Sequence, residues 1–242
     1  MLKINPKIFI ISLVSILLIA HAAADEQKAF HDPVVKKLEG WTIKVDPKLL
    51  KNEHEKFKSE VFDALANHLQ RIKYILSDER VKELQQLPIW LDYHYEPLGN
   101  MQYHPGETWL RANRHDPRLV KHVHIPRAKA LLSRSQWAKH PYVILHELAH
   151  AYHDQVLEKG FQNKEVLDAY NKVKDAGIYE KVLLYSGRTV KHYALTTQME
   201  YFAESTEAYL GVNDFYPFVR AELKEHDPRM FKLLKKIWGE IK

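Results

Sequence analysis

The chain has 242 residues, of which 45% are hydrophobic and none is cysteine, and its formal net charge is +5 at pH 7. This length suits one domain with a sizeable core, and the lack of cysteine excludes a disulfide scaffold and a thiolate metal site. Lysine and arginine alternate with acidic residues and form no basic block. The charge therefore indicates solvated helix faces, not a nucleic-acid partner.

The first 24 residues have the features of a secretory signal peptide. Two lysines precede an uncharged apolar run over residues 8–20, and three alanines, 22–24, precede an acidic pair. An uncleaved anchor is the alternative, but the apolar run is short for a hydrocarbon layer of about 30 Å. We expect a signal peptide over 1–24 and a monomeric domain over 25–242. After cleavage this domain would be secreted or periplasmic, with no insertion into a membrane.

Hydrophobic periodicity predicts a few strands followed by a mostly helical C-terminal half. Strands are indicated where apolar and polar residues alternate, and helices where apolar residues recur at spacings of three and four. We expect strands over 41–45, 87–95 and 120–125, a long helix that begins near 47 and carries its apolar stripe over 57–76, a short helix over 126–132, helices over 141–158, 164–175 and 198–210, a hairpin over 182–194, and a last helix from 228. This order is typical of an α+β domain.

The segment His146-Glu147-Leu148-Ala149-His150 is an H-E-x-x-H motif. Residues four apart lie on the same face of a helix, so His146 and His150 can hold one metal ion. Glu147 can then take a proton from a water molecule on that metal. Zinc suits such a site because it accepts imidazole nitrogen and carboxylate oxygen, leaves a position for water, and lowers the pKa of that water to about 7. We therefore expect one zinc ion per chain.

A pair of hydrogen-bonded core histidines is the alternative interpretation of this motif. The surrounding segment, residues 141–152, is strongly apolar. Two imidazoles and a carboxylate within it would be costly without a partner. A metal ion supplies that partner, and this favours the metal site.

The helix expected over 198–210 offers a third ligand. Glu200, Glu204 and Glu207 lie on one face of it, and three carboxylates on one stripe repel each other unless a positive group faces them. Glu200 also fits the third helical position of a capping box that begins at Thr197. The residues alone leave the third ligand open between Glu200 and Glu204. Glu207 is expected in solvent or in a supporting contact behind a ligand.

Two spans resemble a known family in motif and in spacing. One runs from His146 to Asp154 and reads HELAHAYHD, and the other runs from Tyr193 to Glu204 and reads YALTTQMEYFAE. With residues 205–220 they resemble the anthrax-toxin lethal-factor-like zinc metallopeptidases, which are gluzincins with a third glutamate ligand on a later helix. The resemblance covers about residues 85–242. It implies a zincin-like fold and a stand-alone secreted catalytic domain.

The resemblance also assigns roles to individual residues. It implies that Glu200 is the third zinc ligand and that Glu204 is a carboxylate that orients a ligand histidine. Tyr193, seven residues before Glu200, would stabilise the oxyanion of the tetrahedral intermediate. The alternative for Tyr193 is a strand residue packed in the core.

Two residues of the motif helix have open interpretations. Asp154 lies four residues after His150 and could support a ligand histidine, or it could be an ordinary surface acid. His153 could line the cleft, and exposure to solvent is the favoured interpretation.

The combined expectation is a zinc metalloendopeptidase that hydrolyses peptide or protein substrates through a zinc-bound water activated by Glu147. One alternative is a zinc-binding interaction module without catalysis, although zinc binding alone does not need Glu147. Another is a zinc hydrolase that acts on a non-protein polymer by the same chemistry.

Overall fold

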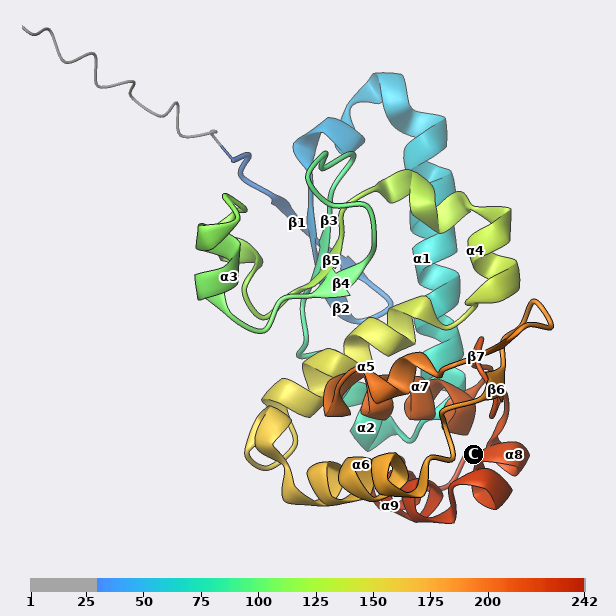
Figure 1. Cartoon of the computed structure of the whole chain (residues 1–242). Helices are drawn as coiled ribbons and strands as arrows, with labels where there is room; N and C mark the ends of the chain where they lie inside the picture. Colours follow the sequence, from blue (N-terminus) through green and yellow to red (C-terminus); the bar gives the residue numbers. More distant parts are fainter. Residues whose placement is uncertain (1–29, 242) are drawn as a thin grey trace, which may run out of the picture. The chain divides into compact units, whose positions relative to one another are not determined.

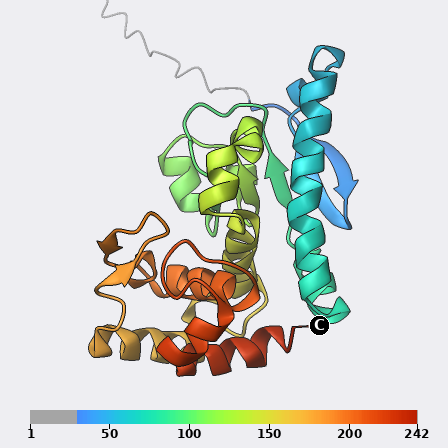
Figure 2. The same cartoon turned by 90° about the vertical axis from the view of Figure 1, so that its right-hand side faces the viewer.

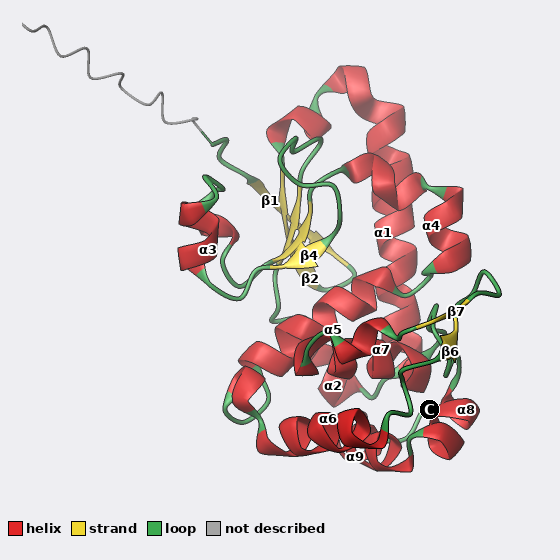
Figure 3. Cartoon of the chain, in the orientation of Figure 1, coloured by secondary structure: helices red, strands yellow, loops and turns green. Residues whose placement is uncertain are grey.

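A mixed sheet forms one part of the structure, and helices make up most of the rest (Figures 1 and 3). The computed structural model describes residues 30–241, and the signal peptide expected over 1–24 lies outside them. The strands of the sheet stand in the order β1-β2-β3-β5-β4. They are β1 (Val34–Leu38), β2 (Trp41–Val45), β3 (Ile89–Leu91), β4 (Gln102–Tyr103) and β5 (Val123–Ile125).

The inner strands run parallel, and the outer two are antiparallel to their neighbours. β2 pairs in parallel with β3, and β3 pairs in parallel with β5. β1 and β4 are antiparallel to β2 and β5. Three-residue β3 and β5 are completely buried. The sequence of β3, Ile-Trp-Leu, is a continuous apolar run, whereas β5 contains the buried His124 between two apolar residues.

The predicted strands are confirmed in position, but two of them are shorter than expected. β3 covers only part of 87–95, and β5 covers only part of 120–125. The sequence prediction missed β1 and β4. Four of the five residues of β1 are exposed, and β4 has only two residues, so neither gives an alternating apolar signal.

A long helix, α1 (Glu55–Ile75), runs beside the sheet (Figure 2). Its buried residues include Val61, Leu65, Leu69 and Ile72, which belong to the predicted stripe and share one core with the sheet. The helix begins later than expected. Residues after Asp46 form two 3-10 turns before α1, namely η1 (Pro47–Leu50) and η2 (Asn52–His54).

The C-terminal half contains a layer of packed helices. Helices α5 (Val143–Gln155) and α7 (Gln198–Leu210) lie side by side, and α6 (Lys164–Ala176) and α9 (Pro228–Trp238) pack against α7 (Figure 1). The remaining α-helices are α2 (Asp78–Leu84), α3 (Glu107–Ala112), α4 (Arg134–Lys139) and α8 (Arg220–His226). Within the described residues, no helix combines the length and the apolar character needed to cross a membrane.

The hairpin and the short helix are confirmed only in outline. The hairpin has two-residue strands, β6 (Val182–Leu183) and β7 (Thr189–Val190), and does not extend to 194. The segment that follows forms the 3-10 helix η6 (Tyr193–Leu195). The remaining 3-10 helices are η3 (Pro117–Leu119), η4 (Ala128–Leu132), which replaces the predicted short helix, and η5 (Gly160–Gln162).

Asp227 joins the last helix to α7. Its Oδ1 accepts a hydrogen bond from the backbone N–H of Met230 at 3.0 Å and so caps α9. Its Oδ2 accepts hydrogen bonds from the hydroxyls of Tyr201, at 2.5 Å, and Tyr179, at 3.3 Å. Tyr201 follows Glu200 in α7, so one buried carboxylate connects the C-terminal helix to the helix of the expected third ligand.

We expect Asp227→Ala to lower the free energy of unfolding by about 3 kcal/mol. The change removes a helix cap and leaves two buried tyrosine hydroxyls without an acceptor. Urea denaturation of the purified protein measures the loss. Asp227→Asn keeps an oxygen acceptor and is the matched control, with a smaller expected loss. Equal stability of wild type and Asp227→Ala would contradict this account of the contact.

Candidate metal centre

The contact between α5 and α7 positions the candidate site. α5 carries the motif residues, and its residues from Val143 to His153 are all buried. Gly211, which ends α7, lies against the ring of Tyr142 at the start of α5, and a Cβ at this position would lie 2.3 Å from a ring atom. A side chain at position 211 would therefore displace the ring of Tyr142 at this approach of the two helices.

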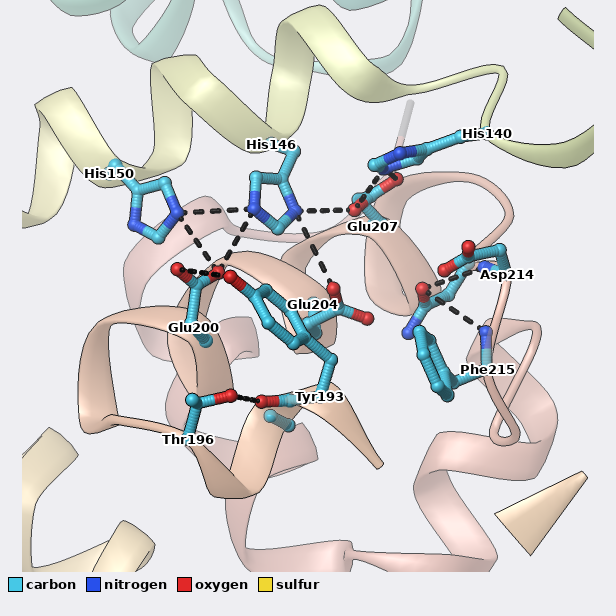
Figure 4. A network of polar contacts seen from close by, with 12 residues as sticks. His140, His146, His150, Tyr193, Thr196, Glu200, Glu204, Glu207, Asp214 and Phe215 are labelled. Atoms are coloured by element: carbon cyan, nitrogen blue, oxygen red, sulfur yellow. Dashed lines mark hydrogen bonds and ion pairs between the residues drawn. The ribbon is translucent and has the colours of Figure 1, made fainter. Parts of the chain in front are cut away.

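His146, His150 and Glu200 bring three ligand atoms together (Figure 4). The two histidine Nε2 atoms are 3.1 Å apart, and each lies 3.2 Å from Oε2 of Glu200. Ligands in a tetrahedral zinc site, with bonds of about 2.0–2.1 Å, are about 3.3 Å apart. The triangle of atoms therefore has the dimensions of one face of a metal tetrahedron, and this group could hold a metal ion.

The charges of these groups are strongly coupled in the protein without metal. Burial opposes protonation of His146, but its hydrogen bonds to Glu200 and Glu207 raise its pKa well above the ordinary value. Burial would raise the pKa of Glu200, yet the hydrogen bonds from His146 and His150 hold it well below its usual range. The triangle thus favours a positive charge at its centre, which either a proton or a metal cation can supply.

Glu147 lies next to the triangle, and its carboxylate has no hydrogen-bond partner among residues 30–241. It lines the cavity in front of His146 and His150, and only 7% of its surface is exposed. Burial raises the pKa of its carboxyl group. A carboxylate that has a raised pKa and lines the cavity is suited to accept a proton from a molecule in the cavity.

Tyr193 belongs to η6 and faces the same cavity (Figure 4). Its hydroxyl lies 3.5 Å from Oε1 of Glu200, and 47% of its surface is exposed. The alternative of a strand tyrosine packed in the core is therefore wrong. His192 holds the turn, because its Nδ1 accepts a hydrogen bond from the backbone N–H of Ala194 at 3.0 Å and its ring stacks on Phe215.

Glu207, not Glu204, makes the hydrogen bond to a histidine of the triangle. Oε1 of Glu207 lies 2.7 Å from Nδ1 of His146, whereas the nearest oxygen of Glu204 lies 3.9 Å from that nitrogen. The expectation that Glu204 orients this histidine is therefore wrong, because Glu204 lies beyond hydrogen-bond distance from it. The solvent-exposed interpretation of Glu207 is also wrong, because Glu207 is buried. At 100° per residue, position 207 returns to within about 20° of Glu200 around the helix axis, and position 204 deviates by about 40°. The seven-residue spacing between Glu200 and Glu207 is therefore the sequence signal that indicates the contact of Glu207 with His146.

Glu204 is a buried acid next to the triangle of ligand atoms. Burial raises its pKa to about 8, and its Oε2 has no hydrogen-bond partner among the described residues. The adjacent Glu207 has a pKa held below its usual range by His140 and His146, although burial acts in the opposite direction. The two neighbouring carboxyl groups therefore have pKa values shifted in opposite directions.

Asp154 supports the rim of the cavity. Its Oδ2 accepts hydrogen bonds from the hydroxyl of Tyr103, at 2.6 Å, and from the ammonium of Lys121. The predicted support of a ligand histidine is wrong for Asp154, because these contacts tie α5 to β4 and to the segment before β5. His153 is completely buried between the rings of Phe161 and Phe202, so its exposed interpretation is also wrong.

The cavity in front of the triangle has a volume of about 600 Å³. One side of it is the segment that leads into β4, and the other is formed by residues from α5, η6 and α7. The sequence prediction missed several residues that line it, because they lie outside any motif. These include Met101, Lys139, His140, Phe161, Asp214 and Phe215.

Two further groups of potential ligands occur among the described residues: His140, His146 and Glu207 share His146 with the triangle, and His31, Asp46 and Asp92 lie near the sheet. Asp92 accepts hydrogen bonds from the indole of Trp90 at 3.1 Å and from Nε2 of His124 at 2.8 Å. Both oxygens of Asp46 accept hydrogen bonds from backbone N–H groups. Hydrogen bonds account for both carboxylates, and this group is a structural network.

Comparison with known protein families, with curated proteins and with solved structures finds no match to this chain.

We expect Glu200→Gln to weaken metal binding more than Glu204→Gln, because only Glu200 completes the triangle of ligand atoms. Glu200→Gln should reduce zinc affinity by at least about 100-fold, and Glu204→Gln should reduce it by less than about 10-fold. Loss of a residue that supports a ligand typically costs about 10–100-fold, so the two variants should lie above and below that range. Competition with a chromophoric chelator measures both. Retention of zinc by Glu200→Gln and loss by Glu204→Gln would move the third ligand to Glu204.

Proposed function

We propose that this chain is a zinc metalloendopeptidase, a secreted monomer with a zincin-like domain related to the lethal-factor-like metallopeptidases. The observation that carries the proposal is the triangle of His146, His150 and Glu200, with edges of 3.1–3.2 Å, beside the cavity-lining Glu147. A metal site that only stabilises the fold is usually closed by four protein ligands, whereas a catalytic site has three and an open position.

The donor set supports zinc as the metal. Two imidazole nitrogens and one carboxylate oxygen are ligands that zinc accepts in a tetrahedral arrangement. His146 is also hydrogen-bonded through its second ring nitrogen to a carboxylate, an arrangement that metal-binding histidines almost always have. These features support one zinc ion per chain.

The residues of the site support a hydrolytic mechanism. Zinc, when bound, would polarise the carbonyl of the substrate and lower the pKa of the attacking water. Glu147 accepts a proton from that water as the oxygen attacks the peptide carbon. It then passes the proton to the leaving amine nitrogen as the C–N bond breaks. Tyr193 donates its hydroxyl hydrogen to the oxyanion that forms in between.

The cavity rim supports a peptide as the substrate. β4 is an edge strand whose outer side has no partner among the described strands, and both of its residues line the cavity. An extended peptide can pair with such an edge through its backbone and so lie across the triangle. The free face of Glu147 argues against a zinc-binding module without catalysis. A zinc-binding protein that cleaves no peptide of the library would point to a non-protein polymer as the substrate.

We expect Glu147→Gln to retain zinc and lose at least about 100-fold in the rate of peptide cleavage, because a general base contributes at least that factor. Cleavage of a fluorogenic peptide library, with and without chelator, and metal analysis measure the two properties. Glu158→Gln changes an exposed glutamate just beyond α5 and serves as the matched control. Normal cleavage by Glu147→Gln would exclude the proposed base.

We expect Tyr193→Phe to keep its fold and zinc affinity and to lose about 100-fold in kcat, because an oxyanion donor is removed without a metal ligand. Steady-state kinetics on the best library peptide measure kcat and KM separately. Tyr185→Phe, in the exposed turn of the β6–β7 hairpin, is the control. A change in KM alone would assign Tyr193 to substrate binding.

A further inference from the structure

We infer that Glu207 and His140 act together as a positioning pair that holds His146 in its metal-binding orientation. The inference rests on the proposed metal function and extends the site beyond the H-E-x-x-H motif. It decides between the two interpretations of Glu207, solvent exposure or a supporting contact, and adds His140, to which the motifs assign no role. Neither of them belongs to the triangle of His146, His150 and Glu200, although both form with His146 a further group whose ligand atoms lie close together.

The first step is the hydrogen bond from His146 to Glu207. Nδ1 of His146 lies 2.7 Å from Oε1 of Glu207, while Nε2 faces Glu200 and His150 (Figure 4). A ring that donates from Nδ1 has its lone pair on Nε2, and Nε2 is the atom in the triangle. Glu207 therefore fixes both the tautomer and the rotation of the ring.

The second step is the need of Glu207 for a partner of its own. This carboxylate is completely buried, and a buried carboxylate is costly unless donors surround it. Nε2 of His140 lies 2.9 Å from Oε1 and 2.8 Å from Oε2 of Glu207. His140 thus forms a hydrogen bond with Oε1 and lies close to Oε2, which has no hydrogen bond of its own among the described residues, so the carboxylate does not depend on His146 alone.

The third step is the place of His140 in the chain. It lies between α4 and α5, close to the start of the helix that carries His146. Its ring also meets the ring of His146 edge to face, at a centroid distance of 5.5 Å and an angle of 88°. The loop before α5 and the last turns of α7 are thereby joined behind one metal ligand.

Glu204 cannot take over this role in the observed arrangement. Its nearest oxygen is 3.9 Å from Nδ1 of His146. It is as deeply buried as Glu207 and lies one turn earlier in α7. Glu204 is therefore a matched control for burial, residue type and helix.

The test compares zinc affinity and metal geometry in four variants of the complete mature protein. Glu207→Gln keeps the volume but replaces one carboxylate oxygen with an amide N–H and removes the negative charge that faces the two histidines. Glu204→Gln is its control. His140→Leu removes the donor to Glu207, whereas His140→Gln restores an amide N–H near the position of Nε2. Zinc affinity is measured by chelator competition, metal geometry by the visible absorption of the cobalt-loaded protein, and folding by thermal unfolding without metal.

We expect Glu207→Gln and His140→Leu to bind zinc about 10–100-fold more weakly and to shift the cobalt bands, as is typical when a contact that orients a ligand is lost. Glu204→Gln and His140→Gln should lose less than about 10-fold. If Glu207→Gln does not fold, the comparison of the two His140 variants decides.

Two results would overturn the inference in distinguishable ways. Wild-type zinc affinity and cobalt bands in both Glu207→Gln and His140→Leu, with or without a fall in thermal stability, would make the pair purely structural and leave the proposed function intact. Failure of the wild-type protein to bind zinc or cobalt would overturn the proposed function together with the inference.

Discussion

The interface between α5 and α7 buries glutamates of one helix against histidines of the other, a combination that a protein interior tolerates only when each charge has a partner. Glu200 meets the Nε2 atoms of His146 and His150, and Glu207 meets the opposite side of the His146 ring. The spacing of the two helices must therefore satisfy both contacts at once. Gly211 permits that spacing, because the ring of Tyr142 occupies the space that a side chain would need.

The other parts of the site are attached to this pair of helices. Tyr193 precedes α7 in a 3-10 turn, so the hydroxyl reaches the triangle from the same segment that supplies Glu200. The rim strand β4 is held to α5 through Tyr103 and Asp154. Glu147 of α5, Tyr193 before α7 and the rim strand β4 thus line one cavity, although they come from three separate segments.

Local patterns in the sequence predicted the elements that carry a strong period. The stripe of α1 was predicted because it buries a regular set of side chains, whereas α5 was predicted from its apolar segment and α7 from its cap at Thr197. The pairing of Glu207 with His146 was not predicted, because it depends on how two helices rotate against each other. His140 lies in a loop with no motif, and β4 is too short for any periodic signal. Such contacts are set by tertiary packing, which a single sequence does not display.

The carboxylate of Asp227 couples the candidate site to the C-terminal helix α9. It caps α9 and receives the hydroxyl of Tyr201, the residue that follows Glu200. Any ligand that holds Glu200 in place also restrains Tyr201, and through it the docking of the last helix. By thermodynamic linkage, a ligand bound in the cavity would protect the C-terminal segment against local opening, and a loosened C-terminus would weaken that ligand by the same free energy.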